Sequence, residues 1–444
     1  MKTNLLALSF VFLVPAFGQL SHTFAQSARD LENYLFDLPG VRFDELNVLP
    51  GFEGCWRLEV TQPLDHNNPS AGTFQQRVYL AQTDVNRPTV MITEGYSRAF
   101  QYPAEITEAI GANQLIVEHR FYGMSLPDSM DYSYLSIEQA AADLHRIRTL
   151  LQDWFVGPWL ASGVSKGGQT TIFYRYFYPE DVAVSVPYVA PINLSLEDPR
   201  IYAFLNTHGS AECRAGILKV QERLLADREA SLLRLKWYTK AEGSEFREYL
   251  NFEEAFEYAV LEYPFSFWQW GASCDELPAA DAPLDDILDH FLEVSGLDFF
   301  SDESMDSYAS HYYQCAREYG YYGYEIGAFG DQIVALAGPQ NPSAIFSPKG
   351  VEVAYDGGVL ANQVWEWAAT SADQFVVING ADDTWSATGL TAEHLAGCDA
   401  LVYLMEGQHH GSARLKNLSD REKKELTKAL ERWLGMPVTG WLAD

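Results

Sequence analysis

Residues 159–168, WLASGVSKGG, hold the pattern that decides the fold. The apolar run Trp159–Gly163 predicts a short strand, and Gln169–Tyr178 predicts the helix that follows it. Between them, Gly163–Gly167 matches G-x-S-x-G, in which glycines flank the serine because side chains there would collide with the strand and the helix. Such a turn raises the hydroxyl of Ser165 above the sheet and directs the backbone N–H of Lys166 toward a developing oxyanion. Ser165 is therefore the candidate nucleophile.

The segments on either side of this turn alternate between strands and helices. The predicted strands are Arg77–Ala81, Thr89–Thr93, Leu115–Glu118 and Val182–Val189. A helix is predicted from Ile137 to Leu151, because Ser136 and Gln139 form a capping box and Gly157 and Pro158 follow its end. This order favours an α/β fold with a parallel sheet and crossover helices.

Between Ser195 and Gly350 the pattern changes to amphipathic helices. The predicted helices are Cys213–Lys240, Phe252–Glu262, Leu284–Val294 and Met305–Tyr319. After Gly350 the α/β rhythm returns, with a helix at Val364–Thr370, strands at Gln374–Ile378 and Ala400–Leu404, and a final helix capped by Ser419 and Glu422. We expect an α/β core in two parts, residues 26–195 and 351–444, interrupted by an all-helical cap at 196–350.

A serine nucleophile needs a base and an acid that orients the base, and both follow late strands. The strand Gln374–Ile378 leads into Asp382 and Asp383, and the strand Ala400–Leu404 leads into His409 and His410. Their order, serine, aspartate and histidine, is that of a hydrolase of this topology. From position alone, either aspartate and either histidine fits, and a turn with surface polar residues is the structural alternative.

The composition limits the classes of partner. The 444 residues include 61 acidic and 30 basic side chains, giving a net charge of −31, and 47% are hydrophobic. The apolar content is sufficient for a folded core. Because the strong negative charge repels phosphate, we expect no binding to nucleic acid or to anionic membrane surfaces.

The N-terminus predicts export. Lys2 precedes the apolar run Leu5–Phe17, which is too short to cross a bilayer, and the small residues Thr23 and Ala25 follow. We expect a signal peptide at residues 1–25, a secreted or periplasmic location, and no stable membrane insertion after its removal.

The cysteines give no sign of a metal site. Five are present, at positions 55, 213, 274, 315 and 398, with no spacing typical of zinc ligands. In an exported protein they could form up to two disulfides, in a pairing that the sequence leaves open.

Two sets of motifs resemble known serine peptidases. Ser165–Gly168, Phe173–Pro179 and Tyr188–Pro191 are similar to the secreted bacterial prolyl tri/tetrapeptidyl aminopeptidases. Glu118–Ser125, Asp383–Trp385 and Glu406–His410 are similar to the related prolylcarboxypeptidase and dipeptidyl peptidase II group. The resemblance spans roughly Trp56–Ser195 and Tyr355–Ser412 and is weakest in the helical insertion. It implies an α/β-hydrolase fold, no cofactor or metal, and cleavage beside proline.

The same resemblance implies roles for the candidate residues. Asp383 is favoured as the acid because it precedes Thr384-Trp385 where the relatives have Asp-Pro-Trp, although Thr384 departs from that pattern. The aminopeptidase pattern favours His410 as the base, and the carboxypeptidase pattern favours His409 as the alternative.

The loop after Thr89–Thr93 adds two further candidates. In this fold it leads to the second oxyanion donor, so a backbone N–H at Gly95 or Tyr96 joins that of Lys166. Similar enzymes that need a free N-terminus carry an acidic group near this loop, which implies that Glu94 binds the substrate ammonium.

Aromatic residues are dense in the insertion, in the run Phe265–Trp270 and at tyrosines 312, 313, 319, 321, 322 and 324. Their flat rings suit a pocket for the bulky, apolar and rigid proline side chain, and ordinary helix packing is the structural alternative.

Together these features predict an exported serine exopeptidase that releases short N-terminal peptides after proline through an acyl-enzyme. Its partners would be peptides with proline near the N-terminus. A carboxypeptidase, an esterase or lipase, and a non-catalytic binding protein on the same scaffold remain as alternatives.

Overall fold

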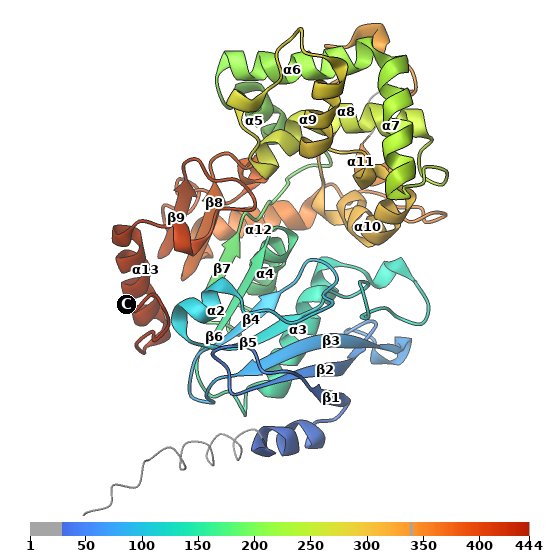
Figure 1. Ribbon diagram of the computed structural model, residues 1–444. Coiled ribbons are helices and arrows are strands. Elements are labelled where there is room, and N and C mark those ends of the chain that lie inside the picture. The colour runs from blue at the N-terminus through green and yellow to red at the C-terminus, as the bar shows by residue number, and fades with distance from the viewer. Residues whose placement is uncertain (1–28, 338–340, 444) are drawn as a thin grey trace, which may run out of the picture.

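The computed structural model describes residues 29–337 and 341–443 (Figure 1). The predicted signal peptide lies outside these residues. Within them, nine strands form one sheet in the order β1-β2-β3-β5-β4-β6-β7-β8-β9. The strands are β1 (Val41–Glu45), β2 (Gly54–Pro63), β3 (Thr73–Gln82), β4 (Thr89–Thr93), β5 (Asn113–Val117), β6 (Trp159–Val164), β7 (Val184–Tyr188), β8 (Phe375–Gly380) and β9 (Ala400–Met405).

The sheet is mixed. Strands β5, β4, β6, β7, β8 and β9 pair in parallel, whereas β1, β2, β3 and β5 pair antiparallel. Every residue of β4, β5 and β7 is buried, as central strands covered on both faces require. The parallel part was predicted from the sequence; the antiparallel edge made by β1 and β2 was not.

Helices cover both faces of the sheet. On one face lie α3 (Ile137–Leu151), α4 (Lys166–Phe177) and α12 (Val359–Ser371), together with a helix at residues 29–37. On the other face lie α2 (Glu105–Ile110) and α13 (Asp420–Leu434). Ser136 and Ser419 accept the capping hydrogen bonds predicted for them. This arrangement confirms the prediction of an α/β-hydrolase fold.

The chain between β7 and α12 forms a layer of helices above the sheet (Figure 1). These helices are α5 (Pro199–Thr207), α6 (Ala211–Ala226), α7 (Arg228–Glu242), α8 (Phe252–Trp270), α9 (Leu284–Val294), α10 (Asp302–Gln314) and α11 (Pro342–Ile345). We call this layer the cap. Among residues 29–337 and 341–443, no helix is both long enough and apolar enough to cross a membrane.

Three cap helices differ from their predicted bounds. The helix expected at Cys213–Lys240 is two helices, because the chain turns at Asp227, a residue with low helix propensity. Helix α8 continues past its expected end and through Pro264 to Trp270, where Gly271 adopts a left-handed conformation that ends it. The helix expected to reach Tyr319 changes at Cys315 into a single π-helical turn.

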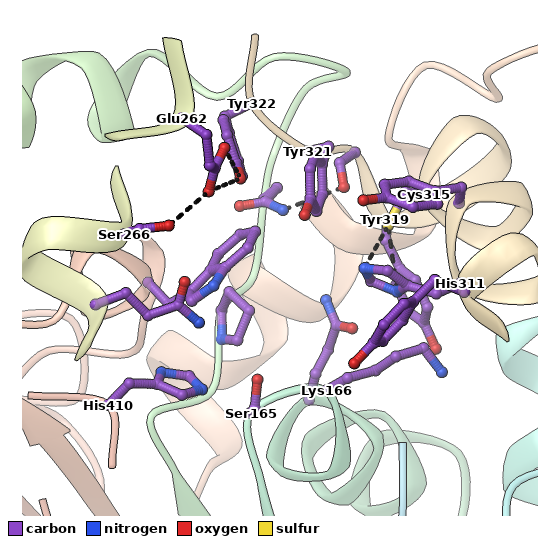
Figure 2. Close-up of a pocket in the computed structure, with 18 of the residues that line it drawn as sticks. Ser165, Lys166, Glu262, Ser266, His311, Cys315, Tyr319, Tyr321, Tyr322 and His410 are labelled. Carbon is purple, nitrogen blue, oxygen red and sulfur yellow. Dashed lines mark hydrogen bonds between the residues drawn. The ribbon is translucent and has the colours of Figure 1, made fainter. Parts of the chain in front are cut away.

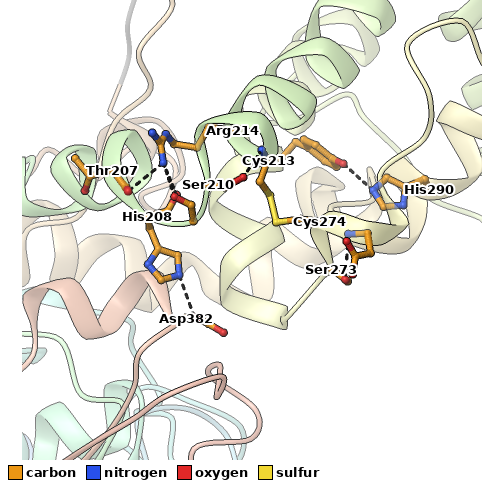
Figure 3. The surroundings of a disulfide bond; sticks show 12 residues. Thr207, His208, Ser210, Cys213, Arg214, Ser273, Cys274, His290 and Asp382 are labelled. Atoms are coloured by element: carbon orange, nitrogen blue, oxygen red, sulfur yellow. Dashed lines mark hydrogen bonds and ion pairs between the residues drawn. A yellow bond between two sulfur atoms is a disulfide. The ribbon is translucent and has the colours of Figure 1, made fainter.

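One disulfide is present in the described part of the chain, where up to two were expected. Cys213 in the first turn of α6 is bonded to Cys274, just beyond α8 (Figure 3). Cys55 and Cys315 are free thiols in buried positions, and Cys398 is free and half-buried. The bond therefore ties two segments within the cap.

Candidate active site

Ser165 lies on a sharp turn between β6 and α4. Its backbone has φ 59° and ψ −125°, a left-handed conformation that non-glycine residues rarely adopt. A Cβ atom added to Gly163 would lie 2.3 Å from the Gly167 carbonyl, and one added to Gly167 would lie 2.5 Å from the Thr93 carbonyl oxygen. Both glycines are therefore needed for this close approach. The sharp turn predicted from G-x-S-x-G is thus present, and its serine faces a cavity.

Asp383 and His410 come together on the two neighbouring loops. Nδ1 of His410 lies 2.9 Å from Oδ2 of Asp383, which is fully buried and also accepts hydrogen bonds from the Trp385 N–H and the Ser386 hydroxyl. Figure 2 shows the His410 ring beside Ser165 at the base of the cavity that both residues line. The arrangement can deprotonate a hydroxyl and stabilise the resulting imidazolium.

The two competing residues point elsewhere. Asp382 lies 3.0 Å from Nε2 of His208 at the end of α5, so it joins the core to the cap (Figure 3). The His409 ring packs against Gly271, where an added Cβ would lie 2.4 Å from Cδ2 of His409. Adjacent side chains on a loop point in different directions. Asp382 and Asp383 therefore have different partners, and so do His409 and His410.

The end of α8 contacts both loops of the site. The His410 N–H donates to the Gln269 carbonyl at 3.1 Å, and the Trp270 ring meets the imidazole edge-to-face at 5.8 Å. Thr384, the departure from the Asp-Pro-Trp pattern, donates its hydroxyl to the Phe265 carbonyl at 3.2 Å. The cap therefore supports the loops that carry His410 and Asp383.

The loop after β4 lies against the turn at Ser165. A Cβ on Gly95 would be 2.6 Å from Cβ of Lys166 and 2.8 Å from the Gly167 nitrogen, so the two backbones are in close contact. Lys166 also donates from Nζ to the Gly95 carbonyl at 2.7 Å, which fixes the peptide plane that carries the Tyr96 N–H. The candidate oxyanion donors of Lys166, Gly95 and Tyr96 thus lie in one region.

The Lys166 side chain is buried among aromatic rings. Its Nζ lies 5.5, 5.1 and 5.4 Å from the ring centres of Tyr96, Tyr122 and Tyr319. Burial lowers the pKa of Lys166 to about 7, although its interaction with Cys315 opposes the shift. The sequence identified only the backbone of Lys166 as important.

The cavity above Ser165 has a volume of about 360 Å³, within the range of small-ligand sites. Its wall is rich in aromatic side chains, which are Tyr96, Trp270, Phe299, Tyr308, Tyr312, Tyr319, Tyr321, Tyr322 and Trp385. Of the tyrosines predicted for a pocket, positions 313 and 324 do not line it. Tyr313 packs with Phe121, and Phe265 stacks on Tyr322 at 4.0 Å behind the wall.

The structure corrects the prediction for Glu94, which does not line this cavity. Its Oε1 lies 2.9 Å from Nε of Arg98 and accepts a hydrogen bond from the Tyr102 hydroxyl at 3.1 Å. The acid that does line the cavity is Glu262 on α8. Sequence analysis missed it, although Glu262, Ser266 and Gln269 recur at the spacing of one helix face.

Among the described residues, no group of three or more histidine, cysteine or acidic side chains is placed to hold a metal ion.

Comparison with known proteins is consistent with this geometry. Residues 25–439 match the PS-10 peptidase S37 family. The chain is 30% identical over 417 residues to a prolyl tri/tetrapeptidyl aminopeptidase of Streptomyces mobaraensis, covering 92% of this chain and 85% of that protein. It is also 33% identical over 99 residues to a human lysosomal Pro-X carboxypeptidase, covering 20% of each chain.

Among solved structures, the proline iminopeptidase of Mycobacterium smegmatis aligns with a TM-score of 0.42 and 14% identity, covering 85% of this chain and 97% of that one. The match over residues 25–439 is decisive for the family. The chain belongs to the S37 family of peptidases and is a serine peptidase.

Proposed function

We propose that this S37 serine peptidase is an exopeptidase that releases short N-terminal peptides by cleavage after proline. The observation that carries the proposal is the combination of Ser165, His410 and Asp383 at the base of a cavity with an aromatic wall. The name of the Streptomyces mobaraensis relative supports the direction of attack and the preference for proline.

The reaction proceeds through an acyl-enzyme. Ser165 Oγ attacks the carbonyl carbon of proline while His410 Nε2 accepts the hydroxyl proton, and Asp383 holds the imidazole and its developing charge. The backbone N–H groups of Lys166 and of Gly95 or Tyr96 donate to the oxyanion. His410 then protonates the leaving amine, and a water molecule, deprotonated by the same histidine, releases the peptide acid and restores Ser165.

The aromatic wall favours proline as the residue before the cleaved bond. A pyrrolidine ring is compact, apolar and already restricted in φ, so it packs on flat aromatic faces at little entropic cost. Trp385 follows Asp383 by two residues and Trp270, at the end of α8, contacts His410, so both indoles lie where that ring would bind.

A carboxypeptidase needs a cation for the substrate carboxylate. Among the described residues that line the cavity, Lys166 is the only lysine or arginine. Its Nζ already donates a hydrogen bond to the Gly95 carbonyl. This engagement favours the aminopeptidase direction.

Export is part of the proposal. The predicted signal peptide at residues 1–25 supports it, and so does the disulfide between Cys213 and Cys274, since such bonds persist in oxidising compartments.

The test is a panel of substrates given to the wild type and to Ser165→Ala. It contains free-amine peptides ending in proline p-nitroanilide, the same peptides ending in alanine, an N-blocked peptide with a C-terminal Pro-Phe, and a short acyl ester. We expect release after proline from the free-amine peptides and loss of that release in Ser165→Ala. Hydrolysis of only the ester, or only of the C-terminal Pro-Phe bond, would refute the aminopeptidase assignment.

A further inference from the structure

Glu262 is a buried acid whose charge, once it ionises, no cation among the described residues balances. Its side chain accepts hydrogen bonds from the hydroxyls of Tyr322 at 2.8 Å and Tyr324 at 2.7 Å, and the Ser266 hydroxyl lies 3.4 Å away. No arginine, lysine or histidine within the described ranges forms an ion pair with it. Three hydroxyl groups hold the carboxylate in place without neutralising it.

Another buried acid of α8 is neutralised. Glu257, five residues earlier on α8, pairs with Arg228 at 2.6 Å and accepts three backbone N–H groups from residues 334–336. Glu257 does not line the cavity, whereas Glu262 does. A buried carboxylate without a cation is costly, so its retention in a cavity wall indicates a cation that arrives with a ligand.

The position of Glu262 relative to Ser165 limits the length of a ligand that reaches both residues. Glu262, Ser266, Gln269 and Trp270 all line the cavity, so one face of α8 runs along its wall. At the Trp270 end, the indole contacts His410 beside Ser165. Figure 2 shows Glu262 at the opposite end of the cavity from Ser165.

We infer that Glu262 binds the α-ammonium group of the substrate and thereby sets the length of the peptide released. This inference rests on the proposed function, because it supplies the N-terminal end of the peptide whose other end reacts at Ser165.

The length follows from helix geometry. Glu262 and Trp270 are eight residues apart on α8, which at 1.5 Å per residue is about 12 Å. An extended peptide advances about 3.4 Å per residue, so three or four residues span that distance. A peptide anchored at Glu262 would thus place its third or fourth residue over Ser165.

The carboxyl group of Glu262 changes its protonation state near neutral pH, whereas the tyrosine hydroxyls that face it do not. Burial raises the pKa of Glu262 to about 7, and its hydrogen bonds from Tyr324, Tyr322 and Ser266 oppose that shift. The facing hydroxyls of Tyr312, Tyr321, Tyr322 and Tyr324 have pKa values raised well above 10 by burial and remain neutral. Lys166, His311 and His410 line the same cavity. Burial also lowers the pKa of Lys166 to about 7, so the pH profile of Glu262→Gln is needed to separate the titration of Glu262 from that of Lys166.

The experiment compares peptidyl-proline p-nitroanilides that differ only at the amino end, with a free ammonium or with hydrogen in its place. The wild type, Glu262→Gln and Glu325→Gln are assayed for kcat/KM. Glu325 is an exposed cap acid bonded to Asn206, so its replacement removes the same charge outside the cavity. Glutamine keeps the size and the hydrogen-bonding capacity of Glu262.

We expect the wild type to favour the free-amine peptide by about 30-fold or more, and Glu262→Gln to reduce that ratio to near one. Glu325→Gln should keep the wild-type ratio. In the wild type the ratio should rise with pH through about 7 as Glu262 ionises, and fall again near pH 8 as the α-amino group loses its proton. Glu262→Gln should lose the rising limb.

A ladder of free-amine peptides with one to six residues ending at proline tests the length. The wild type should show a maximum at three or four residues, and Glu262→Gln should show a flatter profile.

The outcomes separate the two claims. If the wild type cleaves after proline but treats the free-amine and uncharged peptides equally, the anchor is refuted and the proposed function stands. The same conclusion follows if Glu262→Gln keeps the wild-type ratio. If the wild type cleaves none of the series in a Ser165-dependent way, both claims fall. The wild-type comparison decides even if Glu262→Gln does not fold.

Discussion

The floor and the roof of the cavity are built differently. The floor, which we define as Ser165, Asp383 and His410, lies on turns and loops that directly follow β6, β8 and β9. We define the roof as the residues of α8 and the tyrosines between residues 312 and 322 that line the cavity. Contacts among cap side chains hold the roof in place. Backbone geometry places the reacting groups, and side-chain packing shapes what reaches them. Cap residues that do not contact the loops of His410 and Asp383 can therefore change what enters the cavity without disturbing the reacting groups.

The largest expected effect separates the two histidines of the floor. His410→Gln should lower kcat by about 10⁶-fold because the nucleophile loses its base, as seen when a triad serine or histidine is removed. His409→Gln should remain close to the wild type, since His409 packs on Gly271 and does not line the cavity. Steady-state hydrolysis of a prolyl p-nitroanilide measures both. A larger loss for His409→Gln would reverse the assignment.

The next effect separates the two aspartates. Asp383→Asn should lower kcat by about 10⁴-fold, because the amide cannot hold the imidazole in the required tautomer. Asp382→Asn keeps the shape of the contact to His208 and should retain most of kcat. The pair tests whether the loop after β8 serves the floor through Asp383 and the cap contact through Asp382. Equal losses in the two variants would show that this division is wrong.

The smallest expected effect tests whether the roof opens independently of the floor. Cys213→Ser should lower the free energy of unfolding by about 2–4 kcal/mol, because the open chain regains entropy that the bond removed. Cys398→Ser, at a half-buried free thiol, is the matched control.

Hydrogen exchange shows where that loss falls. We expect faster exchange in α6 and at the end of α8 in Cys213→Ser, with unchanged protection in β6 and α4. Equal loss of protection in the central strands would mean that cap and core open as one unit, which contradicts the contrast between floor and roof.

Much of the floor could be predicted because its signals are local. The glycines around Ser165 follow from a tight turn, and the capping residues of α3 and α13 mark their helices. The choice between Asp382 and Asp383 needed the contacts to His208 and His410, which come from distant segments.

The roof was predicted less well because its residues act through long-range contacts. Glu94 and Glu262 are equally acidic in sequence, and what distinguishes them is that Arg98 pairs with the first while no cation in the described residues pairs with the second. The continuation of α8 through Pro264 also depends on packing that no local pattern contains.

The amino-acid sequence by itself determined the alternation of strands and helices around Ser165, the sharp turn at Ser165 and the two loops that carry the candidate acid and base, because spacing and backbone sterics act over a few residues. Tertiary structure decided which aspartate meets which histidine, which acid faces the cavity and how far that acid lies from Ser165. Those relations depend on how the cap packs on the sheet, and packing brings together residues that are more than a hundred positions apart.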